Sequence, residues 1–155
     1  MNVTVIYVGD LKEKYYAEAV AEYEKRIGRY CRVRNVQIKE ERLPEKPSGQ
    51  EIRAALAAEG ARILERVPAR SYTVALCVEG KQLCSEELAA VIADAARDVT
   101  FIIGSSHGLA GTVKESCDLR LSFSKMTFPH RLMRVMLAEQ IYRALSINAG
   151  TGYHK

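Results

Sequence analysis

The chain has little of what membrane, secreted and metal-binding proteins need. It has no tryptophan, four cysteines and three histidines among its 155 residues. No stretch reaches the roughly 20 apolar residues of a membrane-spanning helix. The opening segment, Met1–Tyr16, has neither a basic region before its apolar run nor a small-residue cleavage pattern, as a secretory signal would have. We therefore expect a cytoplasmic protein that does not cross a membrane.

The cysteines and histidines do not form a metal-binding pattern. No two cysteines stand in a C-x-x-C pair, and few histidines could join them, so we expect no zinc or other metal site. In a reducing cytoplasm we also expect no disulfide bond. The residues concerned are Cys31, Cys77, Cys84, Cys117, His107, His130 and His154.

Familiar catalytic motifs are also missing. There is no G-x-S-x-G, H-E-x-x-H, P-loop or G-x-G-x-x-G, and no pair of carboxylates on a recognisable loop. His107 has the chemistry of a general base, although a loop histidine without a function is the plainer interpretation. The absence fits a reaction in which a cofactor supplies the reactivity and the protein supplies position.

What is present is the composition of a globular protein with an uneven charge distribution. With 48% hydrophobic and 27% charged residues, the chain fits one compact domain spanning residues 1–155. The net charge is only +4, but the segment from Lys25 to Arg34 holds five basic residues and no acid. From Leu119 to Lys155, six basic residues face the single acid Glu139. Such clusters suit a phosphate backbone and equally suit a solvated surface.

Strand and helix patterns alternate along the chain. Helix starts are indicated by capping boxes at Asp10 with Glu13 and at Ser48 with Glu51, and by Ser85 before the next apolar stripe. Strands separated by helices predict an α/β fold, a mainly parallel sheet with helices on both faces. The predicted strands are 3–8, 33–38, 72–78, 99–103 and 119–123.

A long helix is predicted from Pro129 to about Ile147. Its apolar residues cover far more than one stripe, so it is expected to be buried on two sides. One side could belong to a second subunit, and the alternative is a central core helix of a monomer.

Three loops follow predicted strands, and ligands of parallel sheets bind at the carboxyl ends of strands. They are 79–81, 104–108 and 122–129. Gly104 and Gly108 permit close backbone approach and positive φ, although a plain turn uses glycine in the same way. The tail, residues 150–155, ends in Tyr153, His154 and Lys155, which could stack on a base and meet phosphate. A disordered polar end is the other interpretation of this tail.

Several blocks together resemble the ribosomal RNA large subunit methyltransferase H family, of the SPOUT class. The resemblance spans essentially the whole chain, and the Leu-Ser…Thr-Phe-Pro-His run is its most specific part. The blocks that carry it are Val8–Tyr16, Glu22–Arg26, Glu79–Lys81, Phe101–Leu109, Leu121–Arg134, Glu139–Ala144 and the terminal Tyr-His-Lys.

The resemblance implies a SPOUT-type α/β fold with a C-terminal trefoil knot, a homodimer, and S-adenosylmethionine as cofactor. It implies methylation of N3 of a pseudouridine in 23S rRNA of the ribosome. Carried over position by position, the cofactor site comprises Leu76, Gly104, Phe123, Ser124, Lys125, Met126, Thr127 and Phe128. Our candidates for the RNA side are Arg131, Arg134, Tyr153, His154 and Lys155. No residue is an obvious proton acceptor, and Arg143 could equally form a helix salt bridge with Glu139.

One position departs from the family pattern, which usually has two adjacent glycines where this chain has Gly104 and Ser105. If position 105 needs a positive φ, serine costs about 1 kcal/mol or more there. This departure supports an alternative, a non-catalytic ribosome- or RNA-binding assembly module on the same fold. A third interpretation is a nucleotide-binding α/β protein that acts on a small molecule, without salt-dependent affinity for ribosomes.

Overall fold

The computed structural model describes residues 1–155, and its strands and helices alternate as the sequence predicts. The strands are β1 (Asn2–Val8), β2 (Arg32–Ile38), β3 (Tyr72–Gln82), β4 (Val99–Ile103) and β5 (Leu119–Ser122). The helices are α1 (Lys14–Ile27), α2 (Gly49–Arg66), α3 (Ser85–Ala95), α4 (Gly111–Ser116) and α5 (His130–Asn148).

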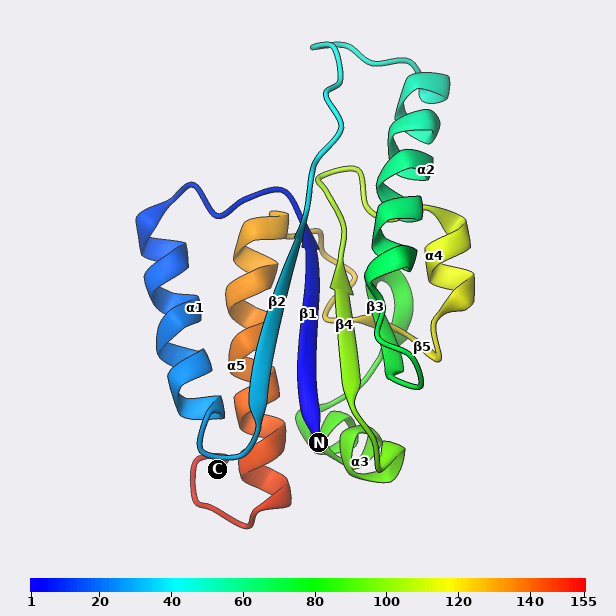
Figure 1. Ribbon diagram of the computed structural model, residues 1–155. Coiled ribbons are helices and arrows are strands. Elements are labelled where there is room, and N and C mark those ends of the chain that lie inside the picture. Colours follow the sequence, from blue (N-terminus) through cyan, green and yellow to red (C-terminus); the bar gives the residue numbers. More distant parts are fainter.

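The five strands form one sheet in the order β2-β1-β4-β3-β5, and all pairings are parallel. Helices α1 and α5 cover one face of the sheet, and α2 and α4 cover the other (Figure 1). Helix α3 packs with α5 on the first face. The predicted α/β fold with a parallel sheet and helices on both faces is confirmed.

The central strand β4 is buried along its whole length and feeds two cores. Val99, Phe101 and Ile103 point into the core under α1, α3 and α5, and Ile102 points into the smaller core under α2 and α4. Such a strand needs apolar side chains on both faces, which explains its unbroken hydrophobic run. Truncating the fully buried Phe101 to alanine should cost about 3–5 kcal/mol of stability.

Of the three helix caps predicted before α1, α2 and α3, one is right and two are wrong. Ser48 caps α2 in a capping box, because its Oγ accepts the Glu51 N–H at 3.1 Å. Asp10 caps nothing: α1 begins at Lys14, and the carbonyl of Asp10 instead accepts a hydrogen bond from Arg131 at 3.0 Å. At α3 the prediction is off by one residue, because Cys84 occupies the N-cap and Ser85 starts the helix.

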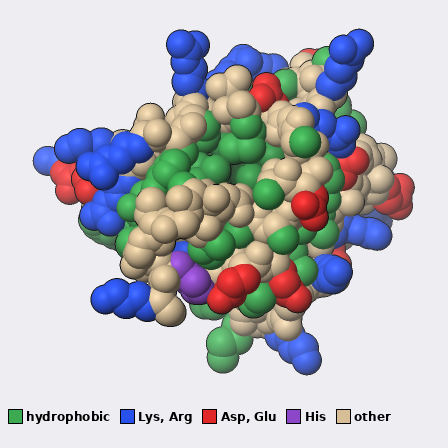
Figure 2. All heavy atoms as spheres, turned by 90° about the horizontal axis from the view of Figure 1, so that it is seen from below, with side chains coloured by type: hydrophobic (Ala, Val, Ile, Leu, Met, Phe, Trp, Pro, Cys, Tyr) green, Lys and Arg blue, Asp and Glu red, His purple; other side chains and the backbone are tan.

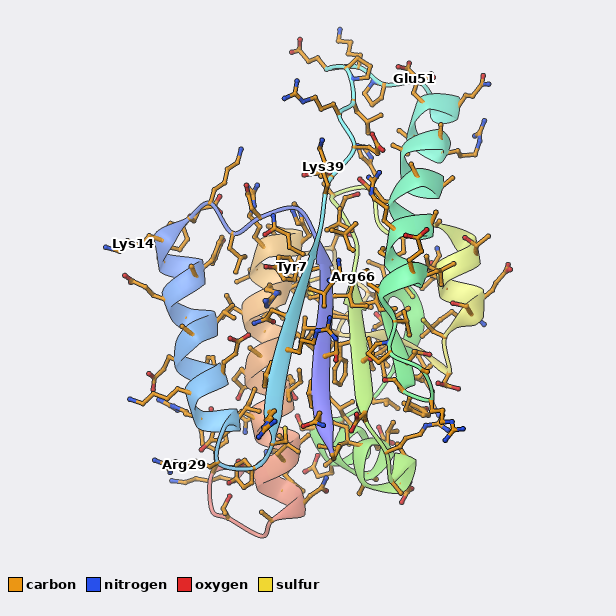
Figure 3. The ribbon with its side chains drawn as sticks, viewed as in Figure 1. Tyr7, Lys14, Arg29, Lys39, Glu51 and Arg66 are labelled. Atoms are coloured by element: carbon orange, nitrogen blue, oxygen red, sulfur yellow. The ribbon has the colours of Figure 1, made fainter.

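Helix α5 begins directly after Pro129, as predicted, and buries a charged residue. The side chain of Arg134 is 4% exposed and lies over the ring of Tyr7, with 4.1 Å from its guanidinium carbon to the ring centroid. Its Nη2 donates to Asn35 Oδ1 at 2.8 Å. Figure 3 shows Tyr7 on the side of β1 that faces α5. Arg134 is therefore part of the core, and the expectation that it contacts RNA is corrected.

An extended segment between β2 and α2, residues 39–48, projects above the rest of the molecule (Figure 1). We call it the connecting arm. Lys39 lies where the arm leaves β2, and Glu51 lies in the first turn of α2 at its other end (Figure 3). None of the helices combines the length and apolar character needed to cross a membrane.

Figure 2 views the molecule from below, from the side on which β1 begins in Figure 1. Hydrophobic side chains gather in the middle of this face, and Lys and Arg side chains project around its edge. In the basic segment predicted from sequence, Arg29, Arg32 and Arg34 are exposed, whereas Arg26 pairs with Glu22 at 3.0 Å. Most of this segment's positive charge thus remains available to a partner.

Candidate functional site

A cavity of about 290 Å³ opens where β3, β4 and β5 end, at the edge of the sheet predicted for ligand binding. Its volume lies near the lower end of the range for small-molecule sites, roughly 300–1,000 Å³. Side chains from several elements line it: Leu76, Cys77, Val78, Glu79, Ile103, Gly104, Ser105, Ser106, His107, Gly108, Leu109, Lys114, Leu121, Ser122, Phe123, Ser124, Met126, Thr127, Phe128, His130 and Met133.

The loop after β4 forms one wall, and its shape depends on glycine. A Cβ at Gly104 would lie 2.2 Å from the carbonyl oxygen of Gly108, so the loop closes on itself only with glycine there. Gly108 has φ +88° and donates its N–H to the Ser105 carbonyl at 2.9 Å. Ser105 is buried and has no positive φ. The strain considered for serine at this position is therefore absent.

The segment between β5 and α5 forms the opposite wall and presents free backbone amides. The Met126 N–H donates to Ser124 Oγ at 3.0 Å, and no other N–H of residues 123–128 donates within the protein. Unpaired backbone groups are costly unless water or a ligand satisfies them. This wall can therefore bind a polar ligand through its main chain.

The third wall comes from an irregularity in β3. Leu76 and Lys81 both pair with Leu121, so the strand leaves its ladder between them. A Cβ at Gly80 would be 2.8 Å from the backbone of Leu121, which is why glycine stands at this close approach. Glu79 of this loop forms an ion pair with Lys114 of α4, and this contact lowers the pKa of the Glu79 carboxyl.

His130, the first residue of α5, also lines the cavity. Its Nε2 is buried and has no hydrogen-bond partner. Burial, and after it the nearby Arg131 guanidinium, lower the pKa of His130 below its ordinary value of 6.5. The ring is therefore mainly neutral at pH 7 and can accept a proton or a hydrogen bond. Nowhere do three or more His, Cys, Asp or Glu side chains come together as they would around a metal ion.

The structure brings nearly all predicted cofactor residues together. Leu76, Gly104 and the segment from Phe123 to Phe128 line the cavity, except for Lys125, which is exposed and does not line it. Sequence reasoning missed Lys114 and His130. Lys114 has no local signal, because its partner Glu79 is 35 residues away. His130 directly follows the predicted loop 122–129, and this adjacency could have identified it.

The C-terminal tail does not line the cavity. Tyr153 Oη donates to Glu139 Oε1 at 3.1 Å, and the imidazole of His154 contacts Glu86 at 2.8 Å and Arg143 at 3.0 Å. Hydrogen bonding from His154 lowers the pKa of Glu86 to about 2. The tail is thus docked on α3 and α5 and is not a free end. Arg143 also forms the helix salt bridge with Glu139 considered above.

Of the remaining candidates for the RNA side, Arg131 forms ion pairs within the protomer and Lys155 forms none. The Arg131 guanidinium pairs with Asp10 at 3.5 Å and Glu13 at 3.3 Å, which ties the start of α5 to the loop after β1. Lys155 is exposed and forms no ion pair with a carboxylate.

A second, largely apolar groove adjoins both the cavity and the tail. It shares Leu121 and Phe123 with the cavity, and it includes Glu86 and Glu139, which hold the tail. Its other lining residues are Tyr23, Leu83, Cys84, Ser85, Leu88, Val135, Met136 and Gln140. The half-buried Val135 and Met136 of α5 therefore face this groove.

The chain is similar over its whole length to known methyltransferases. A family model described as "Predicted SPOUT methyltransferase" matches residues 1–154. A protein of Bifidobacterium adolescentis named ribosomal RNA large subunit methyltransferase H is 50% identical over the full length of both chains. Proteins of the same name from Leuconostoc mesenteroides and Streptococcus gordonii are each 45% identical, again over both full lengths.

Solved structures of low sequence identity share the fold. A probable methylase family protein from Haemophilus influenzae Rd KW20 superposes with a TM-score of 0.56 at 11% identity, covering 99% of this chain and 70% of that one. The SpoU methyltransferase AviRb from Streptomyces viridochromogenes, solved in complex with AdoMet, gives 0.50 at 12% identity, covering 97% and 59%. From the family match, the full-length relatives and the shared fold, we conclude that this chain belongs to the SPOUT methyltransferase family.

Proposed function

We propose that this protein uses S-adenosylmethionine to methylate N3 of a pseudouridine in 23S rRNA, with the large subunit or the 70S ribosome as substrate. The observation that carries the proposal is the cavity at the carboxyl ends of β3, β4 and β5, which gathers the residues expected for the cofactor in a chain of this family. We also propose that residues 1–155 act as one SPOUT domain with a C-terminal trefoil knot, located in the cytoplasm.

The residues that line the cavity support the proposed cofactor. Gly104 allows the loop that forms one wall to close on Gly108, and the amides of residues 123–128 that have no partner within the protein can bind the adenine and carboxylate of the cofactor. Leu76, Ile103 and Phe123 supply apolar surface for the adenine ring. The bound cofactor would supply an electrophilic methyl group, so the protein needs to position the base and does not need a strong nucleophile.

RNA binding is supported by the basic surfaces. Arg29, Arg32 and Arg34 are exposed, and each phosphate that such residues neutralise releases condensed counterions. Arg131 lies beside the cavity, and Tyr153, His154 and Lys155 lie at the tail. We keep these four residues as RNA-side candidates, and Arg134 is excluded by its burial.

A homodimer would bring the tail to a cofactor cavity. Within one protomer the tail reaches Glu139, nine residues along α5 from His130, or about 13 Å at 1.5 Å per residue. The apolar groove between tail and cavity has no partner within the protomer. We propose that a second copy covers it, so that the tail of one protomer serves the cavity of the other.

The non-catalytic alternative has lost its support. It depended on strain at Ser105, and Ser105 has no positive φ and forms a bridge with Gly108. No observation favours a small-molecule substrate over RNA.

The test is methylation of ribosomes. The purified protein is incubated with 70S ribosomes from a strain lacking the modification and with S-adenosylmethionine that carries a labelled methyl group. Nucleosides of the 23S rRNA are then analysed by mass spectrometry. We expect labelled N3-methylpseudouridine. Absence of label in 23S rRNA, from protein that binds the cofactor, would contradict the proposed substrate.

A further inference from the structure

We propose that Glu79 and Lys114 bind the charged amino-acid end of S-adenosylmethionine, with Glu79 accepting from its α-ammonium group and Lys114 donating to its α-carboxylate. The inference rests on the proposed function, because it assigns one part of the cofactor to one part of the cavity. Both residues line the cavity, and neither is among the positions that the family resemblance assigned to the cofactor.

The charged residues of the cavity are few, which limits where a charged ligand group can bind. Apart from two histidines, Glu79 and Lys114 are the only acidic and basic residues that line it. A charged group that leaves water is costly to bury unless an opposite charge or hydrogen bonds compensate it. The amides of residues 123–128 can donate to a carboxylate, but an N–H group cannot accept from an ammonium group. Glu79 is therefore the one anionic acceptor that the cavity offers to the ammonium.

The ion pair between these two side chains leaves part of their hydrogen-bonding capacity unused. Lys114 Nζ donates to Glu79 Oε1 at 2.5 Å. A lysine ammonium has three donors, and both oxygens of a carboxylate accept. No further hydrogen bond joins Lys114 Nζ or Glu79 Oε2 to another residue of the protein. The pair can therefore stay formed while it binds a ligand that carries one positive and one negative group.

Both partners can be reached from solvent. The side chain of Lys114 is 25% exposed and that of Glu79 is 60% exposed. Glu79 stays ionised at neutral pH, because the hydrogen bond from Lys114 lowers the pKa of its carboxyl. The two opposite charges thus lie at the edge of the cavity, where a ligand can meet them without losing all of its water.

The backbone on each side holds the pair in place. Glu79 directly precedes Gly80, where a Cβ would lie 2.8 Å from the backbone of Leu121. Lys114 directly follows Val113, which is fully buried and lies 3.1 Å from where a Cβ of Gly60 would be. The loop of β3 and helix α4 are therefore each packed tightly beside the residue that carries the charge. Groups held in this way lose little freedom when a ligand binds.

A purely structural role is the other explanation of the pair, because it joins α4 to the loop of β3. Exposed ion pairs contribute little to stability, so this role alone would make the pair nearly dispensable. The two explanations also differ in what they require. A structural pair needs only two opposite charges, whereas a ligand site needs the negative charge at position 79 and the positive charge at position 114.

The first experiment compares three ligands with different charged groups. S-adenosylmethionine carries both the ammonium and the carboxylate, decarboxylated S-adenosylmethionine keeps only the ammonium, and 5′-methylthioadenosine lacks the whole amino-acid end. Their Kd values are measured by isothermal titration calorimetry on the full-length protein, and Tm is measured in parallel.

Glu79→Gln should raise the Kd for both ligands that carry the ammonium by about tenfold. Lys114→Met should raise the Kd for S-adenosylmethionine by about tenfold and should not weaken binding of the decarboxylated form. In both variants the Kd for 5′-methylthioadenosine should stay within about twofold of wild type. The matched controls are Glu115→Gln, on the exposed side of α4, and Lys46→Met, in the connecting arm, and both should match wild type for all three ligands.

The second experiment exchanges the two charges. The double variant Glu79→Lys with Lys114→Glu keeps an ion pair, so its Tm should be close to that of wild type. Its Kd for S-adenosylmethionine should stay at least about tenfold higher, because the adenosine end fixes the side on which each charged group lies. Recovery of wild-type affinity in this variant would show that the pair only holds the wall, and it would overturn the proposal.

Two further outcomes would overturn the inference and leave the proposed cofactor standing. One is an equal rise of the Kd for all three ligands in the single variants. The other is wild-type protein that binds S-adenosylmethionine and 5′-methylthioadenosine equally well. Wild-type protein that binds none of the three ligands would instead overturn the proposed function, and this inference with it.

Discussion

The two ends of helix α5 differ in whether their polar groups have hydrogen-bond partners within the protomer. At its start, several polar groups have no partner within the protein: His130 Nε2 is buried and unpaired, and most backbone amides of the cavity-lining segment 123–128 are unpaired as well. At its end, the tail pairs its polar side chains within the protomer, Tyr153 with Glu139 and His154 with Glu86. Unpaired groups that line a cavity are ready for a ligand, whereas paired groups must exchange partners before they can bind one.

At the cavity end of α5, a substitution that changes the shape of the cavity should abolish most of the cofactor binding. Gly104→Ala places a Cβ 2.2 Å from the Gly108 carbonyl and should raise the Kd for S-adenosylmethionine by at least about a hundredfold, measured by isothermal titration calorimetry. The matched control is Gly111→Ala, where a Cβ meets nothing within 4 Å and the Kd should stay within about twofold of wild type. Equal affinity of the Gly104 and Gly111 variants would contradict the site.

At the tail end of α5, a deletion should lower the rate of methylation and leave the affinity for the cofactor unchanged. Deleting residues 153–155 should lower methylation of ribosomes at least about tenfold, because the proposed RNA contacts are lost. The Kd for the cofactor should stay within about twofold of wild type, since no tail residue lines the cavity. A methylation assay beside calorimetry separates the two effects, and a parallel loss of both would erase the distinction between the ends.

Releasing the tail without deleting it should have a smaller effect. Glu139→Gln removes the carboxylate that accepts from Tyr153 and Arg143 and should cost about 1–2 kcal/mol of tail docking. Hydrogen exchange of amides 150–155 should rise accordingly, with exchange at 104–109 unchanged. Faster exchange at both ends would show that they are coupled within one protomer.

A smaller effect is expected in the pH dependence of stability at His130. Its pKa is lowered in the folded protein, so the unfolded chain binds a proton first as the pH falls below about 6.5, and stability declines there. His130→Asn should remove this decline, an effect of less than about 1 kcal/mol for a half-buried group. Urea unfolding of both proteins at pH 7.5 and 5.5 checks it. An identical decline in both would mean that His130 does not cause it.

Glu59 should show the opposite sign. Burial raises its pKa, so the folded protein holds the proton longer and the carboxyl lowers stability as the pH rises above its ordinary 4.5. Glu40, Glu41 and Arg62 are the charged groups near it. The stabilisation by Glu59→Gln should be larger at pH 7 than at pH 4, as measured by urea unfolding. A larger gain at pH 4 would contradict the raised pKa.

Sequence patterns predicted the scaffold well and the side-chain pairings poorly. The buried run of β4 and the glycines of the 104–108 loop are local signals, and both led to the right elements. The cap at Asp10 was predicted wrongly, because α1 begins only at Lys14, and Asp10 instead contacts Arg131 of a distant helix. Nothing in the sequence distinguishes Arg134 from a surface arginine, and only the packing of α5 on β1 shows that it is buried.

The sequence by itself determined the order of strands and helices, the loops at the carboxyl ends of the strands, and the family to which the chain belongs. These follow from periodicity, glycine placement and matching blocks, which are properties of neighbouring residues. The tertiary structure alone decided that Lys114 meets Glu79, that the Glu59 carboxyl accepts the Glu41 N–H, and that the tail is docked away from the cavity. Each of these contacts joins residues more than ten positions apart, and only the packing of the sheet brings such residues together.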